Sequence, residues 1–188
     1  DVKIGITNSG FSFSIGFCFL PSESKEEFIW AFQCFKGIEI NPAVVINDGD
    51  QAQKHAVEVF SYAATLICIW HVNQCVLVKY KSTIGNEDWP EFEAAWRKII
   101  QAPTVDQFNK DWFDFQGKYS TPKAQPYITY LKNEWLKPGQ RERLVEALTN
   151  QHRHFGIRKT SRVEGAHAYI KRYLGGKKSK GKLYSSWI

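Results

Sequence analysis

The acid Asp48 is the residue whose type and position point most directly to chemistry. It follows the apolar run of residues 43–46 and is followed by a helix-like pattern. The run indicates a buried strand of a parallel sheet, and open α/β sheets bind ligands and metals at the carboxyl ends of such strands. The alternative is that Asp48 only caps the next helix. The residues alone favour this alternative.

Cys68 and His71 form a Cys-x-x-His pair that could bind a metal. The pair offers two zinc ligands at a usable spacing, and His152 and His154 could supply the others. The alternative is a buried Cys on a strand together with a His that makes a supporting or capping hydrogen bond. Because a pair alone is weak support for a metal site, we do not expect zinc here.

Basic side chains gather in the C-terminal third of the chain. The candidates for DNA contacts are Arg158, Lys159, Arg162, Lys171 and Arg172. A rim of such cations is what a DNA backbone needs, and the net charge of +6 permits a polyanionic partner. An ordinary solvated helix face explains the same residues equally well.

The elements that must position these residues begin with a strand, helix, strand unit over residues 43–71. Ahead of it, residues 2–19 alternate between apolar and polar around a turn at Asn8-Ser9-Gly10, which predicts a β-hairpin. Its aromatic stripe is expected to be core: Phe11, Phe13, Phe17 and Phe19. Ser24 and Glu27 fit a capping box at the start of a helix that stops near Gly37.

Residues 72–159 are expected to be helical and to contain no strand of the main sheet. The aromatic spacings of Phe108, Trp112 and Phe115 motivate this expectation. Residues 141–150 read as one short helix. A last helix over residues 162–174 carries Glu164 in its first turn, and a flexible basic segment follows it.

The composition fits one globular domain. The chain has 188 residues with 43% hydrophobic and 23% charged residues. Its four cysteines lie among apolar neighbours, so we expect them to be reduced and mostly buried in an intracellular protein. No apolar run approaches the ~20 residues that span a membrane.

The ordered motifs resemble the MULE (Mutator-like element) transposase domain. In that family an apolar strand ends in an aspartate, and a helix and a strand ending in Cys-x-x-His follow. Here these motifs are Asp48 and Cys68-Ile69-Trp70-His71. The segment from Thr160 to His167 is similar to the family's segment with its last catalytic acid. The likeness runs from about residue 2 to about residue 174.

This resemblance implies an α/β fold with an RNase H-like mixed sheet and a large all-helical insertion before the last helix. It implies that Asp48 and Glu164 are the second and third acids of an Asp-Asp-Glu triad that binds Mg²⁺ or Mn²⁺. Hard carboxylate oxygens are the ligands these ions require. The two carboxylates are therefore expected to approach each other at one sheet edge.

The main departure from the family concerns the first acid. In the family it lies on a strand upstream of the segment that matches residues 2–7, and Asp1 is too close to that segment to be the same residue. We therefore expect the chain to begin after the first catalytic strand. The expected function is metal-dependent DNA cleavage and strand transfer at transposon ends, by a fragment without its first acid. The alternative is a non-catalytic, transposase-derived DNA-binding or regulatory protein.

The resemblance also divides the chain and implies its partners. The expected parts are a core over residues 1–71, an all-α insertion over 72–159, a catalytic-type helix over 160–174 and a basic tail over 175–188. The expected partner is DNA at terminal inverted repeats, with self-association as a further expectation. No membrane association is expected, and the expected location is the nucleus.

Overall fold

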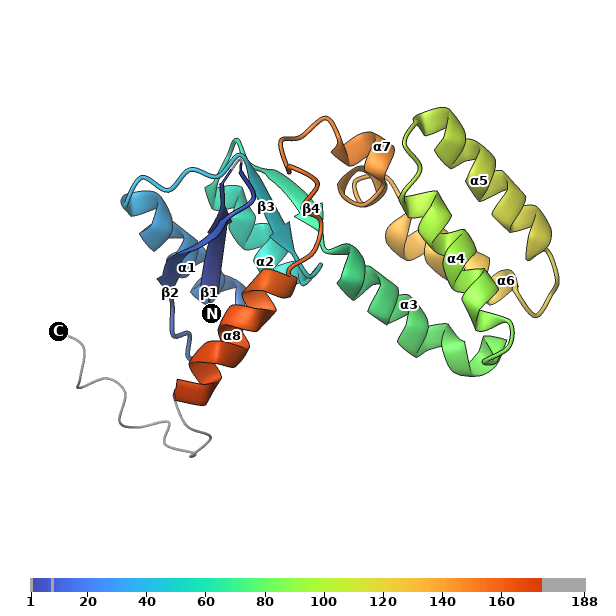
Figure 1. Ribbon diagram of the computed structural model, residues 1–188, viewed down its shortest axis with the longest axis horizontal. Coiled ribbons are helices and arrows are strands. Elements are labelled where there is room, and N and C mark those ends of the chain that lie inside the picture. Colours follow the sequence, from blue (N-terminus) through green and yellow to red (C-terminus); the bar gives the residue numbers. More distant parts are fainter. Residues whose placement is uncertain (1, 8, 174–188) are drawn as a thin grey trace. The chain divides into compact units, whose positions relative to one another are not determined.

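The computed structural model describes residues 2–7 and 9–173 and has a mixed α/β architecture (Figure 1). It is mostly helical, with two small two-stranded sheets. Residues 2–7 and 9–20 form one compact unit with residues 161–173, and residues 21–160 form the other. Among the described residues, no helix combines the length and apolarity needed to cross a membrane. The predicted basic tail lies outside the described residues.

The first unit contains the predicted hairpin. Strand β1 (Val2–Ile6) pairs antiparallel with β2 (Ser12–Phe17). Gly10 supplies the positive φ of 83° that the connecting turn needs. Helix α8 (Ser161–Tyr173) packs against β1 (Figure 1).

The hairpin does not carry the single aromatic core face that its alternation predicts. A bulge opposite Lys3 and Ile4 shifts the register, so Phe13 lies opposite Gly5 whereas Phe17 lies opposite Val2. Directly opposed residues share a face, so the bulge turns Phe13 and Phe17 to opposite faces. The four phenylalanines of the stripe are all exposed: Phe11, Phe13, Phe17 and Phe19. The expectation that they form core was wrong. It assumed an uninterrupted alternation along the strand, and the bulge interrupts that alternation.

The second unit contains the predicted strand, helix, strand motif. Strands β3 (Val44–Asn47) and β4 (Ala64–Ile67) are parallel and are joined by α2 (Gln51–Ala56) and the short helix η1 (Val57–Val59). Among the described residues each strand pairs on one side only. The residues from Val44 to Ile46 are therefore only half-buried, and not buried on both faces as expected.

Helix α1 (Lys25–Gly37) begins and ends where the capping signals place it. The Ser24 hydroxyl accepts a hydrogen bond from the Glu27 N–H at 3.3 Å, and the helix stops at Gly37. Its buried face includes Phe32, whose ring packs on that of Phe60 with 5.5 Å between centroids. This packing ties α1 to the helical connection between β3 and β4.

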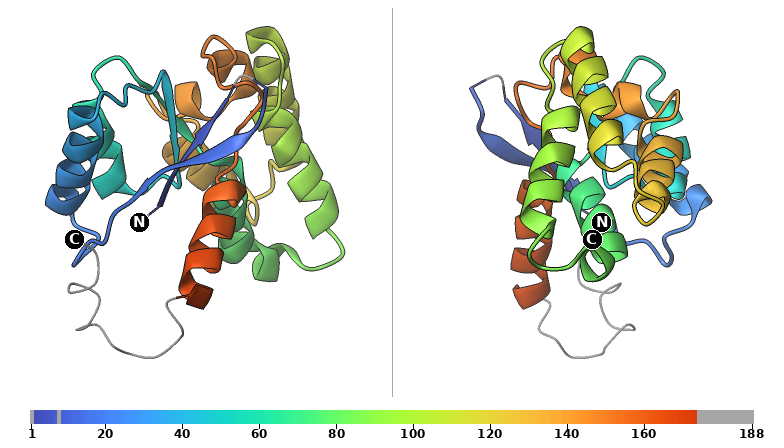
Figure 2. Two further views of the ribbon diagram at one scale, coloured as in Figure 1. Left: turned by 60° about the vertical axis from the view of Figure 1, so that its left-hand side comes forward. Right: turned by 90° about the vertical axis from the view of Figure 1, so that its right-hand side faces the viewer.

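The interval 72–159, which the structure describes completely, contains helices and no strand. Its elements are α3 (Ile69–Ile84), α4 (Trp89–Ile100), α5 (Val105–Lys118), α6 (Gln125–Tyr130), the π-helix η2 (Leu131–Trp135), the 3₁₀ helix η3 (Arg141–Arg143) and α7 (Glu146–Thr149). Helices α4 and α5 lie side by side in both views of Figure 2. The one helix predicted over residues 141–150 is broken into two. The break falls at Leu144, whose carbonyl accepts from the Arg158 guanidinium instead of a helical N–H.

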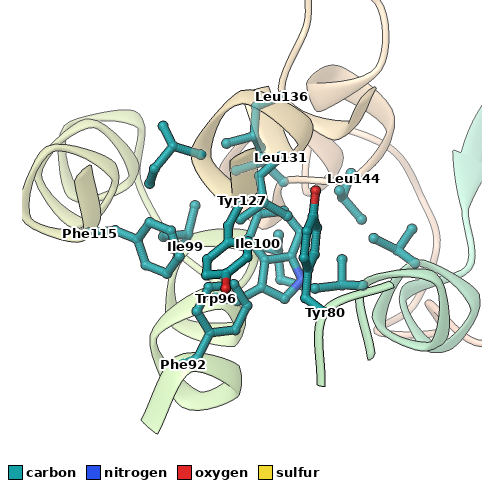
Figure 3. Close-up of a cluster of buried hydrophobic side chains, with 14 of the residues drawn as sticks. Tyr80, Phe92, Trp96, Ile99, Ile100, Phe115, Tyr127, Leu131, Leu136 and Leu144 are labelled. Atoms are coloured by element: carbon teal, nitrogen blue, oxygen red, sulfur yellow. The ribbon is translucent and has the colours of Figure 1, made fainter. Parts of the chain in front are cut away.

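An aromatic core holds these helices together (Figure 3). Trp96 and Phe92 are almost fully buried at its centre, and the Trp96 ring N–H donates to the Asn73 side-chain oxygen at 3.1 Å. Phe92 packs edge-on against Tyr127, and Tyr80 does the same. The helical segment therefore has a core of its own.

Candidate functional site

Asp48 lies directly beyond the carboxyl end of β3, where the sequence placed it. Its Oδ1 accepts the Asp50 N–H at 3.0 Å. Asp50 in turn caps α2, because its Oδ1 accepts the N–H groups of Ala52 at 2.8 Å and Gln53 at 3.0 Å. The helix-cap interpretation of Asp48 was therefore wrong, since its neighbour Asp50 fills that role. No hydrogen bond to Asp48 Oδ2 occurs within the described part of the chain.

The parallel register brings the end of β4 beside Asp48. Asn47 lies opposite Ile67, and the Cys68 N–H donates to the Asn47 carbonyl at 2.7 Å. The pKa of the Cys75 thiol is raised, first by burial and then by the negative charge of Asp48. Asp48 therefore stands at one sheet edge with Cys68.

Asn47 is a residue of this edge that the sequence analysis missed. Its side-chain oxygen accepts the Gly49 N–H at 3.0 Å, but its Nδ2 is buried without a partner among the described residues. A buried amide donor is costly to leave unpaired. The sequence signal was an Asn directly after the apolar run of residues 43–46, and it was interpreted only as part of the turn.

Cys68 and His71 meet Thr160 at the start of α3. Strand β4 ends at Ile67, so Cys68 occupies the N-cap position of α3 and His71 lies in its first turn, rather than on a strand end as expected. The N–H and the hydroxyl of Thr160 each donate to Cys68 Sγ at 3.3 Å, and Thr160 Oγ1 lies 3.4 Å from His71 Nδ1. Thr160 was expected only as a helix cap.

His154, one of the two further histidines of the zinc hypothesis, is engaged elsewhere. His154 Nδ1 accepts the Gly156 N–H, and its Nε2 lies 3.1 Å from the Asn150 side-chain oxygen. Within residues 2–7 and 9–173, no group of three or more His, Cys, Asp or Glu side chains is arranged to hold a metal ion. Within the described residues, Cys68 and His71 both lie within hydrogen-bonding distance of Thr160.

Residues 2–75 match the family described as the MULE transposase domain. The match supports a MULE transposase domain in this segment. No curated protein matches the chain. The matched segment of the MULE domain contains Asp48, Cys68 and His71, which share one sheet edge, and it ends within α3. A transposase domain implies interaction with DNA, so the charged residues that follow it are relevant to its function.

Arg158 is the one basic candidate that the structure ties into the interior. Only 8% of its surface is exposed; it donates to the Leu144 carbonyl and pairs with Glu146 at 3.3 Å. Burial lowers its pKa, and Glu146 opposes that shift. Arg158 thus supports the chain that leads to Thr160, and its guanidinium is not presented to solvent.

The remaining basic candidates lie on or next to α8. Lys159 and Arg172 are exposed, and Lys171 also belongs to this helix. Arg162 is exposed and donates to the Gly10 carbonyl at 2.7 Å and to the Ser12 hydroxyl at 2.6 Å. This arginine therefore also joins α8 to the hairpin turn.

Glu164 lies where the sequence placed it, in the first turn of α8, and its side chain is exposed. It belongs to the unit that contains the hairpin, whereas Asp48 belongs to the other unit. The approach of the two carboxylates therefore stays a prediction.

Proposed function

We propose that this chain is the catalytic part of a Mutator-like DNA transposase that cuts DNA and transfers strands at transposon ends. The family match over residues 2–75 supports the class of protein. The observation that carries the catalytic proposal is the position of Asp48. It follows a parallel strand directly, and Asp50 rather than Asp48 caps the next helix. This is the position at which such sheets bind ligands.

Asp48 and Glu164 would hold Mg²⁺ or Mn²⁺ in an RNase H-like arrangement. Asp48 Oδ2, which accepts no hydrogen bond from the described residues, is a hard oxygen donor of the kind these ions bind, so this residue fits the role. When bound, such ions activate a water or 3′-hydroxyl and stabilise the leaving oxygen of a phosphodiester. Asp48 and Glu164 would contribute position and negative charge. Lys159, Arg162, Lys171 and Arg172 would contact the DNA backbone.

The first acid of the triad would come from a further strand. Each strand of the β3–β4 sheet pairs on one side only within the described residues, which leaves room at its edges for another strand. The orphaned Asn47 Nδ2 lies at the same end of β3 as Asp48 and would gain a partner there. We propose that this strand completes both the sheet and the metal site of a nuclear enzyme.

The test is a cleavage assay on DNA that carries the element's terminal inverted repeats. A protein that includes the strand with the first acid should cut in Mg²⁺ or Mn²⁺, and Asp48→Ala and Glu164→Gln should each abolish cutting. Glu58→Gln, an exposed acid on η1, is the matched control and should leave cutting intact. A complete protein that binds these ends but never cuts them would support the non-catalytic alternative.

A further inference from the structure

Phe155 combines an unfavourable backbone conformation with an exposed aromatic ring. Its φ is 52°, in the left-handed region, and 59% of its surface is exposed. Among the described residues other than glycine, only Glu39 shares a positive φ. Bulky side chains are rare in this region, and such strain persists where the surrounding structure over-determines it and gathers at functional sites. Burial does not offset the strain at Phe155, so packing does not explain the ring.

The structure around Phe155 fixes this turn firmly. His154 is only 8% exposed, its N–H donates to the His152 carbonyl and its carbonyl accepts from Ile157, both at 2.8 Å. The His154 ring accepts the Gly156 N–H at 3.1 Å and bonds Asn150 on its other side. The left-handed conformation is therefore imposed by the neighbours of Phe155.

The base of the same loop is also anchored. We call residues 150–158 the Phe155 loop. At its end, the Arg158 side chain is held by Leu144 and Glu146, and its carbonyl accepts the Ile69 N–H at 3.0 Å. The loop thus presents one aromatic ring to solvent from a rigid base, at low cost in conformational freedom on binding.

The charges beside the ring are of one sign. Arg153 and Lys159 are exposed, two residues before and four residues after Phe155 in the chain, and residues 150–159 include no acid. The nearby Glu146 is already paired with Arg158. An exposed ring with exposed cations close to it in the chain matches the two requirements of single-stranded nucleic acid, which are a surface for base stacking and positive charge for the backbone.

We infer that the Phe155 loop binds unpaired DNA, with Phe155 stacking on one base and Arg153 and Lys159 contacting the adjacent phosphates. The inference rests on the proposed function and adds a ligand class to it: single-stranded DNA, as arises where strands part at a cut end. Bases in an intact duplex are already stacked on each other, so the ring would distinguish unpaired from paired DNA.

The test is fluorescence anisotropy of the 188-residue chain with matched single-stranded and duplex oligonucleotides. Phe155→Ala should weaken single-strand binding about tenfold, within the range for loss of one stacked base, and change duplex binding less than about twofold. Phe155→Trp should retain binding. Phe113→Ala is the matched control, since Phe113 is 75% exposed on α5 and should leave both affinities unchanged.

A second variant separates the ring from the backbone. Phe155→Gly removes the ring but suits a positive φ, so it should melt no lower than the wild type and still bind single strands as weakly as Phe155→Ala. An oligonucleotide carrying 2-aminopurine should lose fluorescence on binding the wild type, and this quenching should disappear in both variants.

The possible failures are distinct. Phe155 variants that bind single strands like the wild type would overturn the inference while leaving the proposed function standing, provided duplex binding is intact. Equal weakening by Phe113→Ala would also overturn it. A wild-type chain that binds neither form of DNA would overturn both the inference and the DNA-binding part of the proposed function.

Discussion

The helical segment from α3 to α7 and the β3–β4 sheet differ in how completely they bury their apolar side chains. The helices enclose Trp96, Phe92 and their neighbours almost completely. The sheet leaves Val44 to Ile46 half-buried and an amide donor on Asn47 unpaired. The helical segment carries its own stabilisation, whereas the sheet that bears Asp48 depends on further contacts. The predictions below test this contrast.

The largest expected effect concerns cleavage, because the proposed function needs a further strand that brings the first acid to Asp48. We expect the chain of 188 residues to bind DNA weakly, with affinity that falls as salt rises, and not to cut it in Mg²⁺ or Mn²⁺. A protein that adds the strand with the first acid should cut. Both are assayed on the same DNA, with Asp48→Ala as the control. Metal-dependent cutting by the shorter chain that Asp48→Ala abolishes would mean that a local residue supplies the first acid.

Within the helical segment, Trp96→Ala should cause the greatest loss of stability. It removes a fully buried ring and the hydrogen bond to Asn73, and large-to-small core substitutions of this kind cost about 3–5 kcal/mol. Chemical denaturation monitored by circular dichroism would measure the change. Phe113→Ala, at an exposed position on the same segment, should change the free energy of unfolding by less than about 0.5 kcal/mol. Similar losses in both variants would contradict the closed-core description.

A smaller effect is expected at the junction of the two regions. Thr160→Val keeps the β-branched shape and the backbone N–H but removes the hydroxyl that bonds Cys68 and lies near His71. The free energy of unfolding should fall by about 1 kcal/mol, the usual net value of one hydrogen bond. Thr129→Val, at an exposed position of α6, is the control. A Thr160→Val protein as stable as this control would show that the hydroxyl contributes nothing.

The smallest effect should depend on pH. The pKa of His154 lies below its ordinary value of 6.5, chiefly through burial and then through the positive charge of Arg158, while Glu146 acts in the opposite sense. A lowered pKa means that the unfolded chain binds the proton more tightly. The contribution of neutral His154 is therefore complete above about pH 6.5 and is lost as the pH falls toward the folded pKa.

The free energy of unfolding measured between pH 8 and pH 5 should show this loss. His154→Gln should reduce the slope below pH 6.5, whereas His55→Gln, at an exposed position of α2, should not. Equal slopes in the wild type and His154→Gln would show that another group is responsible.

The sequence identified features that depend on near neighbours. The cap at Ser24 was predicted because a cap involves residues three positions apart, and it makes the expected bond. The hairpin and the parallel strand, helix, strand unit were likewise correct. The position of Asp48 at a strand end followed from the same local pattern.

The features that were missed depend on pairing or on distant residues. The bulge opposite Lys3 and Ile4 is a property of two strands and cannot be read from the alternation of one. Two of the expected buried cysteines, Cys34 and Cys75, are exposed, Cys18 is half-buried and Cys68 is buried. Arg158 was predicted to contact DNA because the residues next to it in the sequence do not indicate that it pairs with Glu146.

The joining of Ile69 to Arg158 and of Cys68 to Thr160 has a consequence for how this domain can vary. The helices from α3 to α7 leave the sheet and return to it through one point, where the Ile69 N–H and the Arg158 carbonyl are 3.0 Å apart. Because the two ends of this segment are joined to each other, its length has little effect on the strands that precede it. It can be lengthened, shortened or exchanged as a cassette, and a short linker in its place would leave the path from β4 to Thr160 intact.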